Sequence, residues 1–224
     1  MGDIDTHAGI IKRLANETGA VVAAIDYRLA PQFKFPVQLD ECEEFVNFLS
    51  NHAEDYQLDK DNISLAGDSA GAHLSLATAI KIRDRNNNSL KIKTLLLYYG
   101  SFGLGDSMSM RLYGGYWDGL STKELNYYQE QYAHSKDQDN PYRNLFNSDL
   151  TFGLPPAYIL ACELDPLADD SRLLYAILNE HELTAQLDIF DGVIHGFLHY
   201  SRALSQSLEA IKSSAEFYKK YSTK

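Results

Sequence analysis

The sequence has few cysteines, little positive charge and no long hydrophobic run. Only Cys42 and Cys162 occur among 224 residues, and we interpret both as buried free thiols in a reducing compartment. Lys and Arg total 20 against 31 Asp and Glu, and the net charge of −11 argues against nucleic acid and anionic membranes as partners. No apolar run approaches a membrane span, and the first residues lack the basic and apolar regions of a signal peptide. We therefore expect a cytoplasmic protein.

The composition otherwise fits an ordinary globular protein. Hydrophobic residues make up 45% and charged residues 23% of the chain, and 224 residues can bury a sizeable core. Internal repeats and low-complexity tracts are absent from the sequence. We therefore predict a single α/β domain that covers residues 1–224.

Short apolar runs alternate with segments of helical spacing along the chain. The runs predicted to be buried strands are 21–25, 63–66, 94–99, 157–162 and 185–190. The segments predicted to be helices are 6–18, about 37–49, 70–82, 169–181 and a closing helix over 196–221. This alternation predicts a mostly parallel sheet with helices on both faces. Residues 101–154 break the pattern and are predicted to form an insertion with short helices near the site.

The motif Gly67-Asp68-Ser69-Ala70-Gly71 joins one predicted strand to a helix-forming segment. Strand, tight turn and helix is the context of a nucleophile elbow, in which Ser69 projects its hydroxyl from the sheet edge. The N–H of Ala70 opens the helix and is a candidate donor to an oxyanion. The alternative interpretation is a plain helix entry with Ser69 as its N-cap.

A nucleophilic serine needs a base and a group that orients the base, and both must follow strands whose carboxyl ends converge. Asp165 follows the run that ends at Cys162, and His195 follows the run that ends at Phe190. The order Ser69, Asp165, His195 is that of a hydrolase triad. We predict that Ser69 attacks an ester carbonyl, His195 transfers its proton and Asp165 orients the imidazole.

Each assignment has an alternative. Asp165 is next to Pro166 and would also suit a helix cap, and Asp169 and Asp170 are rival orienting groups inside the following helix. His195 and His199 are four residues apart, which suggests a metal pair. Because a third ligand and the glutamate of the His-Glu-x-x-His pattern are absent, we predict no metal site and a structural role for His199. His73 is predicted to pack within its helix.

Several motifs together resemble the hormone-sensitive-lipase-like esterases of the α/β-hydrolase fold, and within that family the acetyl esterase branch. The segments that carry the resemblance are 26–31 (Asp-Tyr-Arg-Leu-Ala-Pro), 67–71, 116–120, 165–167, 169–175 and 195–202. The resemblance covers almost the whole chain. It implies a serine carboxylesterase for short acyl chains, with Ser69, Asp165 and His195 as the triad. It also implies that the enzyme needs no metal or organic cofactor and acts on a small-molecule ester.

One departure from the family concerns the N-terminus. Members carry a His-Gly-Gly-Gly segment whose N–H groups complete the oxyanion hole, and this chain starts at Met1-Gly2-Asp3, just after that segment would end. The family's leading strands are missing too. In the sheet order of the family, one of these strands lies between the predicted strands 21–25 and 63–66. We therefore interpret the chain as N-terminally truncated, with weak or no activity as an isolated polypeptide. A second copy or a partner protein would then cover the truncated face.

The competing hypothesis is a non-catalytic binding or regulatory protein built on a truncated hydrolase frame. A further question is the acyl pocket, for which the candidates are the aromatic residues Phe102, Tyr113, Tyr116, Trp117 and Phe197. For at least half of these, ordinary core packing is the simpler interpretation.

Overall fold

A four-stranded sheet forms the centre of the computed structural model, which describes residues 2–85, 90–116 and 119–222. Its strands are β1 (Ile63–Asp68), β2 (Ile92–Tyr98), β3 (Ala157–Leu164) and β4 (Ala185–Ile194). They lie in the order β1-β2-β3-β4, and every neighbouring pair is parallel. This confirms the predicted parallel sheet and four of its five predicted strands.

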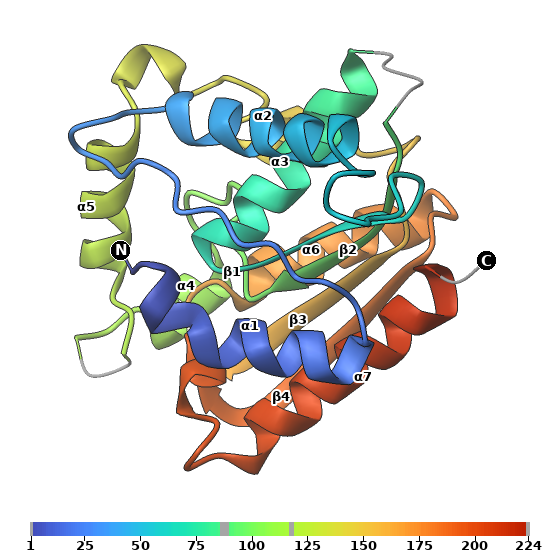
Figure 1. Ribbon diagram of the computed structural model, residues 1–224. Coiled ribbons are helices and arrows are strands. Elements are labelled where there is room, and N and C mark those ends of the chain that lie inside the picture. The colour runs from blue at the N-terminus through green and yellow to red at the C-terminus, as the bar shows by residue number, and fades with distance from the viewer. Residues whose placement is uncertain (1, 86–89, 117–118, 223–224) are drawn as a thin grey trace.

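Helices cover both faces of the sheet (Figure 1). On one face lie α1 (Ile4–Thr18) and α7 (Ser205–Ser222), and on the other lie α2 (Val37–Asn51), α3 (Ala70–Asp84) and α6 (Ala168–Glu180). Strand β2 shows why two cores form, because successive side chains of a strand point to opposite faces. Leu95 and Leu97 are buried with α3 and α6, whereas Leu96 and Tyr98 are buried with α1 and α7.

Helix α1 has clear start and stop signals in the sequence. Asp3 accepts a hydrogen bond from the Thr6 N–H at 2.8 Å, and the Thr6 hydroxyl caps the Asp3 N–H in return. At the other end Gly19 has φ 72°, a left-handed conformation that glycine adopts without a steric cost. Ile10 and Leu14 are buried on the inner face. The helix is thus fixed at both ends and packed against the sheet.

The predicted strand over residues 21–25 is wrong. The segment runs as an extended, irregular stretch, and the Val21 side chain is 75% exposed. A strand needs a hydrogen-bonded neighbour, and β1 pairs only with β2 among the described residues. A hollow lies between the segment and β1, and residues of both line it. Within the part of the chain that the structure describes, the apolar run therefore pairs with no strand.

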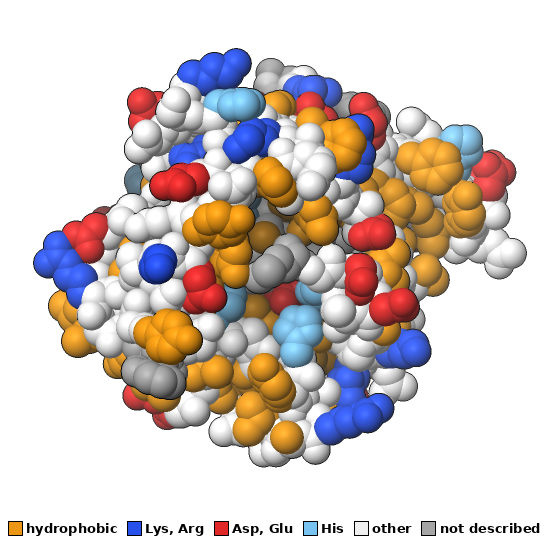
Figure 2. Space-filling model, turned by 90° about the vertical axis from the view of Figure 1, so that its left-hand side faces the viewer, with side chains coloured by type: hydrophobic (Ala, Val, Ile, Leu, Met, Phe, Trp, Pro, Cys, Tyr) orange, Lys and Arg blue, Asp and Glu red, His pale blue; other side chains and the backbone are white. Residues whose placement is uncertain are grey.

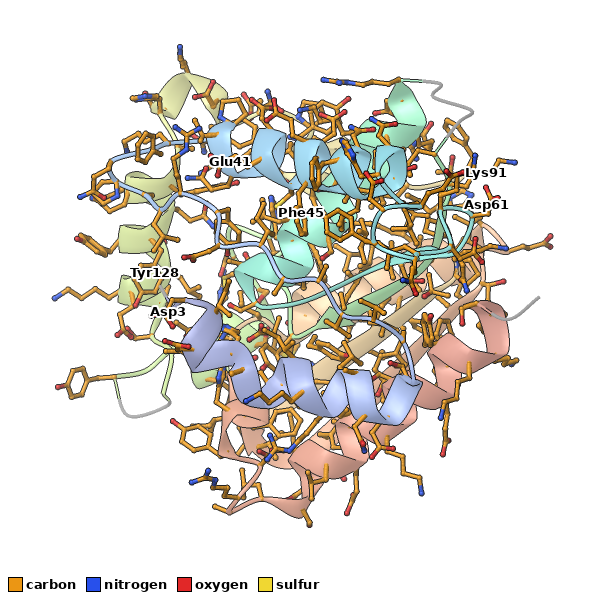
Figure 3. The ribbon with its side chains drawn as sticks, viewed as in Figure 1. Asp3, Glu41, Phe45, Asp61, Lys91 and Tyr128 are labelled. Atoms are coloured by element: carbon orange, nitrogen blue, oxygen red, sulfur yellow. The ribbon has the colours of Figure 1, made fainter. Side chains whose placement is uncertain are left out.

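This hollow is part of a cleft of about 1750 Å³ that extends to the end of β1. Phe45 points into the cleft from α2 (Figure 3). The irregular segment is tied to α2 at Arg28. The Glu41 carboxylate accepts the Arg28 N–H at 2.8 Å and also pairs with the Arg28 guanidinium, and the Gln38 amide donates to the Arg28 carbonyl at 2.8 Å. The free edge of β1 thus faces an open, largely apolar space, and cover by a second copy or a partner stays a prediction.

The region between β2 and β3 holds short elements, namely α4 (Met108–Tyr113), α5 (Thr122–Tyr132), η1 (Ser135–Asp137) and η2 (Leu145–Asn147). The closing helix begins later than predicted, because a separate 3-10 turn, η3 (Phe197–Tyr200), precedes α7. The Ser207 hydroxyl donates to the Phe197 carbonyl at 2.7 Å, so that group is satisfied without a continuous helix. Among the described residues, no helix combines the length and hydropathy needed to cross a membrane.

Candidate active site

Ser69 occupies a sharp turn between β1 and α3. Its backbone has φ 54° and ψ −114°, a conformation that L-residues with side chains rarely adopt. The Ser69 N–H donates to the Tyr98 carbonyl at 2.9 Å, so the hydrogen bonding between β1 and β2 continues up to Ser69 itself. The next residue, Ala70, begins α3. The chain therefore reverses direction at Ser69, as the motif predicts.

The two glycines of the motif have different roles. A Cβ atom on Gly67 would lie 2.3 Å from the backbone carbon and oxygen of Gly71 and 2.8 Å from the Ala72 nitrogen. A Cβ atom on Gly71 would meet no atom within 4 Å. Only Gly67 is thus required for the close approach of strand and helix, and it allows the first turn of α3 to lie directly against β1.

A hydrogen-bonded chain links the three predicted triad residues. The His195 Nε2 atom lies 2.9 Å from the Ser69 hydroxyl oxygen, and the His195 Nδ1 atom lies 2.7 Å from Oδ2 of Asp165. His195 is mostly buried, and the Asp165 side chain is fully buried. Ser69 follows β1, Asp165 follows β3 and His195 follows β4, so the carboxyl ends of three parallel strands bring them together.

Asp165 is held from two sides. Its Oδ1 atom accepts the Leu167 N–H at 2.9 Å, and its backbone carbonyl accepts the Ala168 N–H at 3.0 Å. The predicted helix-capping contact and the contact with His195 therefore coexist, because each uses a different carboxylate oxygen. This arrangement fixes the orientation of the carboxylate toward the imidazole.

The rival aspartates have other partners. Asp169 binds Arg172 at 3.0 Å and accepts the Ser109 N–H at 2.8 Å. Oδ1 of Asp170 accepts the N–H groups of residues 102, 103 and 104 at 2.6, 2.9 and 3.3 Å, and its Oδ2 atom is buried without a partner. Burial raises the pKa of Asp170 to about 6, although these N–H groups act in the opposite direction. Asp170 thus anchors the loop after β2.

Two histidines lie beside the turn, namely His199, for which the sequence predicts a structural role, and His7, to which it assigns none. His199 does not pair with His195, and instead its Nε2 atom lies 3.3 Å from Oδ2 of Asp68. The Nε2 atom of His7, from α1, lies 3.5 Å from Oδ1 of the same carboxylate. No spacing rule could have found this group, because His7 and His199 lie in opposite ends of the chain. His73 is buried, and its Nδ1 atom bonds the Ser101 carbonyl at 2.8 Å.

The space around Ser69 is the inner end of the cleft. Ala70 lines it, and as the first residue of α3 its N–H has no partner within the helix. Tyr99 lines it too, and the Tyr99 ring lies edge-on to the His195 ring with centroids 5.0 Å apart. Figure 2 shows histidine side chains gathered around a hollow on this face of the molecule.

The aromatic residues predicted for an acyl pocket do not form one. Phe102 and Phe197 are fully buried in the two cores, whereas Tyr116 is 83% exposed. Of the four that the structure describes, none lines the cleft, and Trp117 lies outside the described residues. Other aromatic residues line it, among them Tyr99, Tyr127, Tyr128 and Tyr132. Of the five aromatic candidates, Phe102 and Phe197 are the two to which the interpretation of core packing applies.

Comparison with known proteins agrees with this architecture. A family model described as the alpha/beta hydrolase fold matches residues 1–199. The acetyl esterase of Salmonella typhi is 42% identical over 219 residues, which are 97% of this chain and 68% of that protein. A crystal structure of a Pyrobaculum calidifontis esterase superposes with a TM-score of 0.93 at 32% identity, and covers 98% of this chain and 72% of its own. A thermostable carboxylesterase from a metagenomic library superposes with a TM-score of 0.93 at 27% identity, and the match covers 98% of this chain and 75% of that one.

The motif glycines provide a matched pair of substitutions. We expect Gly67→Ala to destabilise the protein by at least about 2 kcal/mol, because a methyl group would collide with the backbone of α3. Gly71→Ala should leave stability unchanged or raise it by up to about 1 kcal/mol, because the site is open and helical. Urea unfolding followed by circular dichroism measures both. Equal effects of the two substitutions would contradict the close-packing argument.

Asp170 predicts a pH effect on stability. Because its pKa in the folded state, about 6, lies above the unfolded value of 3.8, this carboxyl stabilises the fold most below about pH 4. That contribution, at most about 3 kcal/mol, is lost as the pH rises through 6. Asp170→Asn keeps the acceptor oxygen without the titration. As the pH rises from 4 to 7, the unfolding free energy of the variant should therefore rise relative to that of the unmodified protein. A difference between the two proteins that does not change with pH would refute this.

Proposed function

Because this chain belongs to the α/β-hydrolase family, as an esterase of that family, we propose that it is a serine carboxylesterase that acts on short-chain, acetyl-type esters. The proposed catalytic residues are Ser69, Asp165 and His195, with the Ala70 N–H as an oxyanion donor. The name of the Salmonella typhi relative supports the acetyl group as the acyl part. The proposed substrate is thus a small ester of acetate or a similar acid.

The observation that carries the proposal is the continuous hydrogen-bonded chain from Asp165 through His195 to Ser69. Its two distances, 2.7 and 2.9 Å, are within the range needed for proton transfer. The acceptor on the far side is a fully buried carboxylate, where an imidazolium is stabilised more strongly than in water. His195 is therefore suited to accept the Ser69 proton as the hydroxyl attacks.

The proposed reaction has two halves. In the first, the Ser69 oxygen bonds to the ester carbonyl carbon, His195 takes the hydroxyl proton and passes it to the departing alcohol, and an acyl-enzyme remains. In the second, His195 takes a proton from water, the resulting hydroxide attacks the acyl carbon, and Ser69 leaves with that proton. Asp165 keeps the imidazole in one tautomer throughout. These steps use protein groups and water alone.

The oxyanion would be stabilised by the Ala70 N–H at the positive end of the α3 dipole. The 224 residues contain no His-Gly-Gly-Gly segment to provide further donors. Loss of one such donor lowers turnover by roughly 10²–10³ in a well-studied protease. We therefore propose that the polypeptide of residues 1–224 is an impaired esterase.

The proposed compartment is the cytoplasm. Its support is the state of the two cysteines, which are both free thiols. Burial raises the pKa of the Cys42 thiol to about 12, and Cys162 is fully buried. Thiols of this kind are inert toward oxidation and suit a reducing environment.

Hydrolysis of p-nitrophenyl acetate tests the function. We expect slow but measurable turnover by residues 1–224, lower by about 10²–10³ than that of the Salmonella typhi relative assayed in parallel. Ser69→Ala should abolish this turnover, because the nucleophile is lost. Ser75→Ala removes another hydroxyl that lines the cleft and should change little, so it serves as the control.

Two results would count against the proposal, and they are distinguishable. Equal rates for the unmodified protein and Ser69→Ala would contradict the esterase mechanism itself. Turnover as fast as that of the relative, abolished by Ser69→Ala, would contradict only the predicted impairment.

A further inference from the structure

Two histidines converge on the carboxylate that precedes Ser69. His7 comes from α1, Asp68 ends β1 and His199 lies in η3, so three distant parts of the chain meet here. The candidate ligand atoms all lie within 4.8 Å of one another. Within residues 2–85, 90–116 and 119–222, this is the one group of three or more His, Cys, Asp or Glu side chains so arranged.

The spacing suits a tetrahedral ion. Ligand atoms about 2 Å from a Zn²⁺ ion stand about 3.3 Å apart at a tetrahedral angle. Nε2 of His7 lies 3.5 Å from Oδ1 of Asp68, and Nε2 of His199 lies 3.3 Å from Oδ2 of the same carboxylate, so each distance is close to that value. The two imidazole rings are perpendicular, with centroids 4.8 Å apart. To bind one ion, a single Asp68 oxygen would have to face both imidazoles, and the three ligand atoms, now within 4.8 Å of one another, would have to draw together.

The two ring nitrogens of His7 face different groups. Its Nδ1 atom lies 3.0 Å from the Asp3 carbonyl oxygen, which can only accept a hydrogen bond. The Thr6 hydroxyl oxygen lies 3.0 Å from the same Nδ1 atom. In the neutral tautomer with the proton on Nδ1, the lone pair of Nε2 points at the Asp68 carboxylate. An imidazole held by a backbone carbonyl, with its other nitrogen free to bind, is the usual arrangement around a bound metal ion.

The other two groups support the same arrangement. The Tyr99 hydroxyl donates to Oδ2 of Asp68 at 3.3 Å, which leaves Oδ1 to the His7 side of the cluster. The Thr6 backbone, next to His7, hydrogen-bonds the His199 ring. The His7 and His199 side chains are 30% and 32% exposed, and all three groups line the cleft. An ion and a bound water molecule could enter from solvent.

We propose that His7, Asp68 and His199 form a binding site for one divalent transition-metal ion of the Zn²⁺ type, with water as the fourth ligand. Two imidazoles and one carboxylate are a ligand set that this class of ion favours over Ca²⁺ or Mg²⁺. The ion would tie α1 and η3 to the end of β1, and it would stand beside the proposed catalytic serine without a part in the chemistry. The sequence argument against a metal rested on the lack of a third ligand and of the glutamate of the His-Glu-x-x-His pattern beside His195 and His199, and it does not apply to ligands that come from three elements.

Cobalt titration of the untagged protein tests the site, because tetrahedral Co²⁺ gives a visible absorption band and takes the ligands of Zn²⁺. We expect one Co²⁺ per chain, displaced by Zn²⁺. His7→Gln and His199→Gln should each weaken binding at least about tenfold, since even outer partners of a metal site cost that much. His52→Gln, which alters an exposed histidine paired with Asp55, is the matched control and should bind as the unmodified protein does.

Thermal unfolding gives a second readout. Zn²⁺ at ten times its dissociation constant should raise the Tm of the unmodified protein and the control by about 3–6 °C, and should raise that of either site variant by no more than about 2 °C. Far-ultraviolet circular dichroism checks that each variant is folded, and the two variants alter different elements. Absence of a saturable band, or equal affinity in all four proteins, would overturn the proposal and leave the cluster as a proton-bridged contact.

Discussion

The close contact between the backbone of Gly67 and the first turn of α3 is the constraint on which the site depends. Because no side chain separates β1 from the helix at this point, the chain reverses within one residue. That residue, Ser69, takes up the positive φ that the reversal requires. Its hydroxyl then lies beyond the sheet edge, at the start of a helix whose first N–H groups have no partner within the helix. Backbone geometry thus sets the position and the electrostatic surroundings of the nucleophile together.

The turn after β4 works with this elbow. His195 and His199 are four residues apart, and they contact two successive residues, Ser69 and Asp68. Gly196, with φ 76°, gives the turn its shape. One short segment therefore contributes an imidazole to the proposed catalytic chain and another to the proposed metal cluster. His7 completes the second group from α1, which couples the N-terminal helix to the site.

The sequence predicts the parallel sheet and the candidate site well, for a physical reason. Parallel strands end at one edge, so the order of Ser69, Asp165 and His195 after three strands is enough to predict that they meet. The strand over residues 21–25 could not be judged in this way, because an apolar run does not say whether a partner strand lies beside it. The pairing of His7 with Asp68 depends on how α1 packs, and local spacing carries no information on that. The break between η3 and α7 is accompanied by a hydrogen bond from the Ser207 hydroxyl to the Phe197 carbonyl, which the sequence pattern does not indicate.

The central claim is that the hydrogen-bonded chain makes Ser69 a nucleophile. Reaction with a fluorophosphonate, followed by peptide mass spectrometry, tests it without any assumption about the natural ester or about rates of deacylation. We predict a single adduct, on Ser69, whose formation is slowed strongly by His195→Ala and little by His52→Ala. Failure of Ser69 to react in the folded protein, or labelling that is unaffected by His195→Ala, would contradict the account.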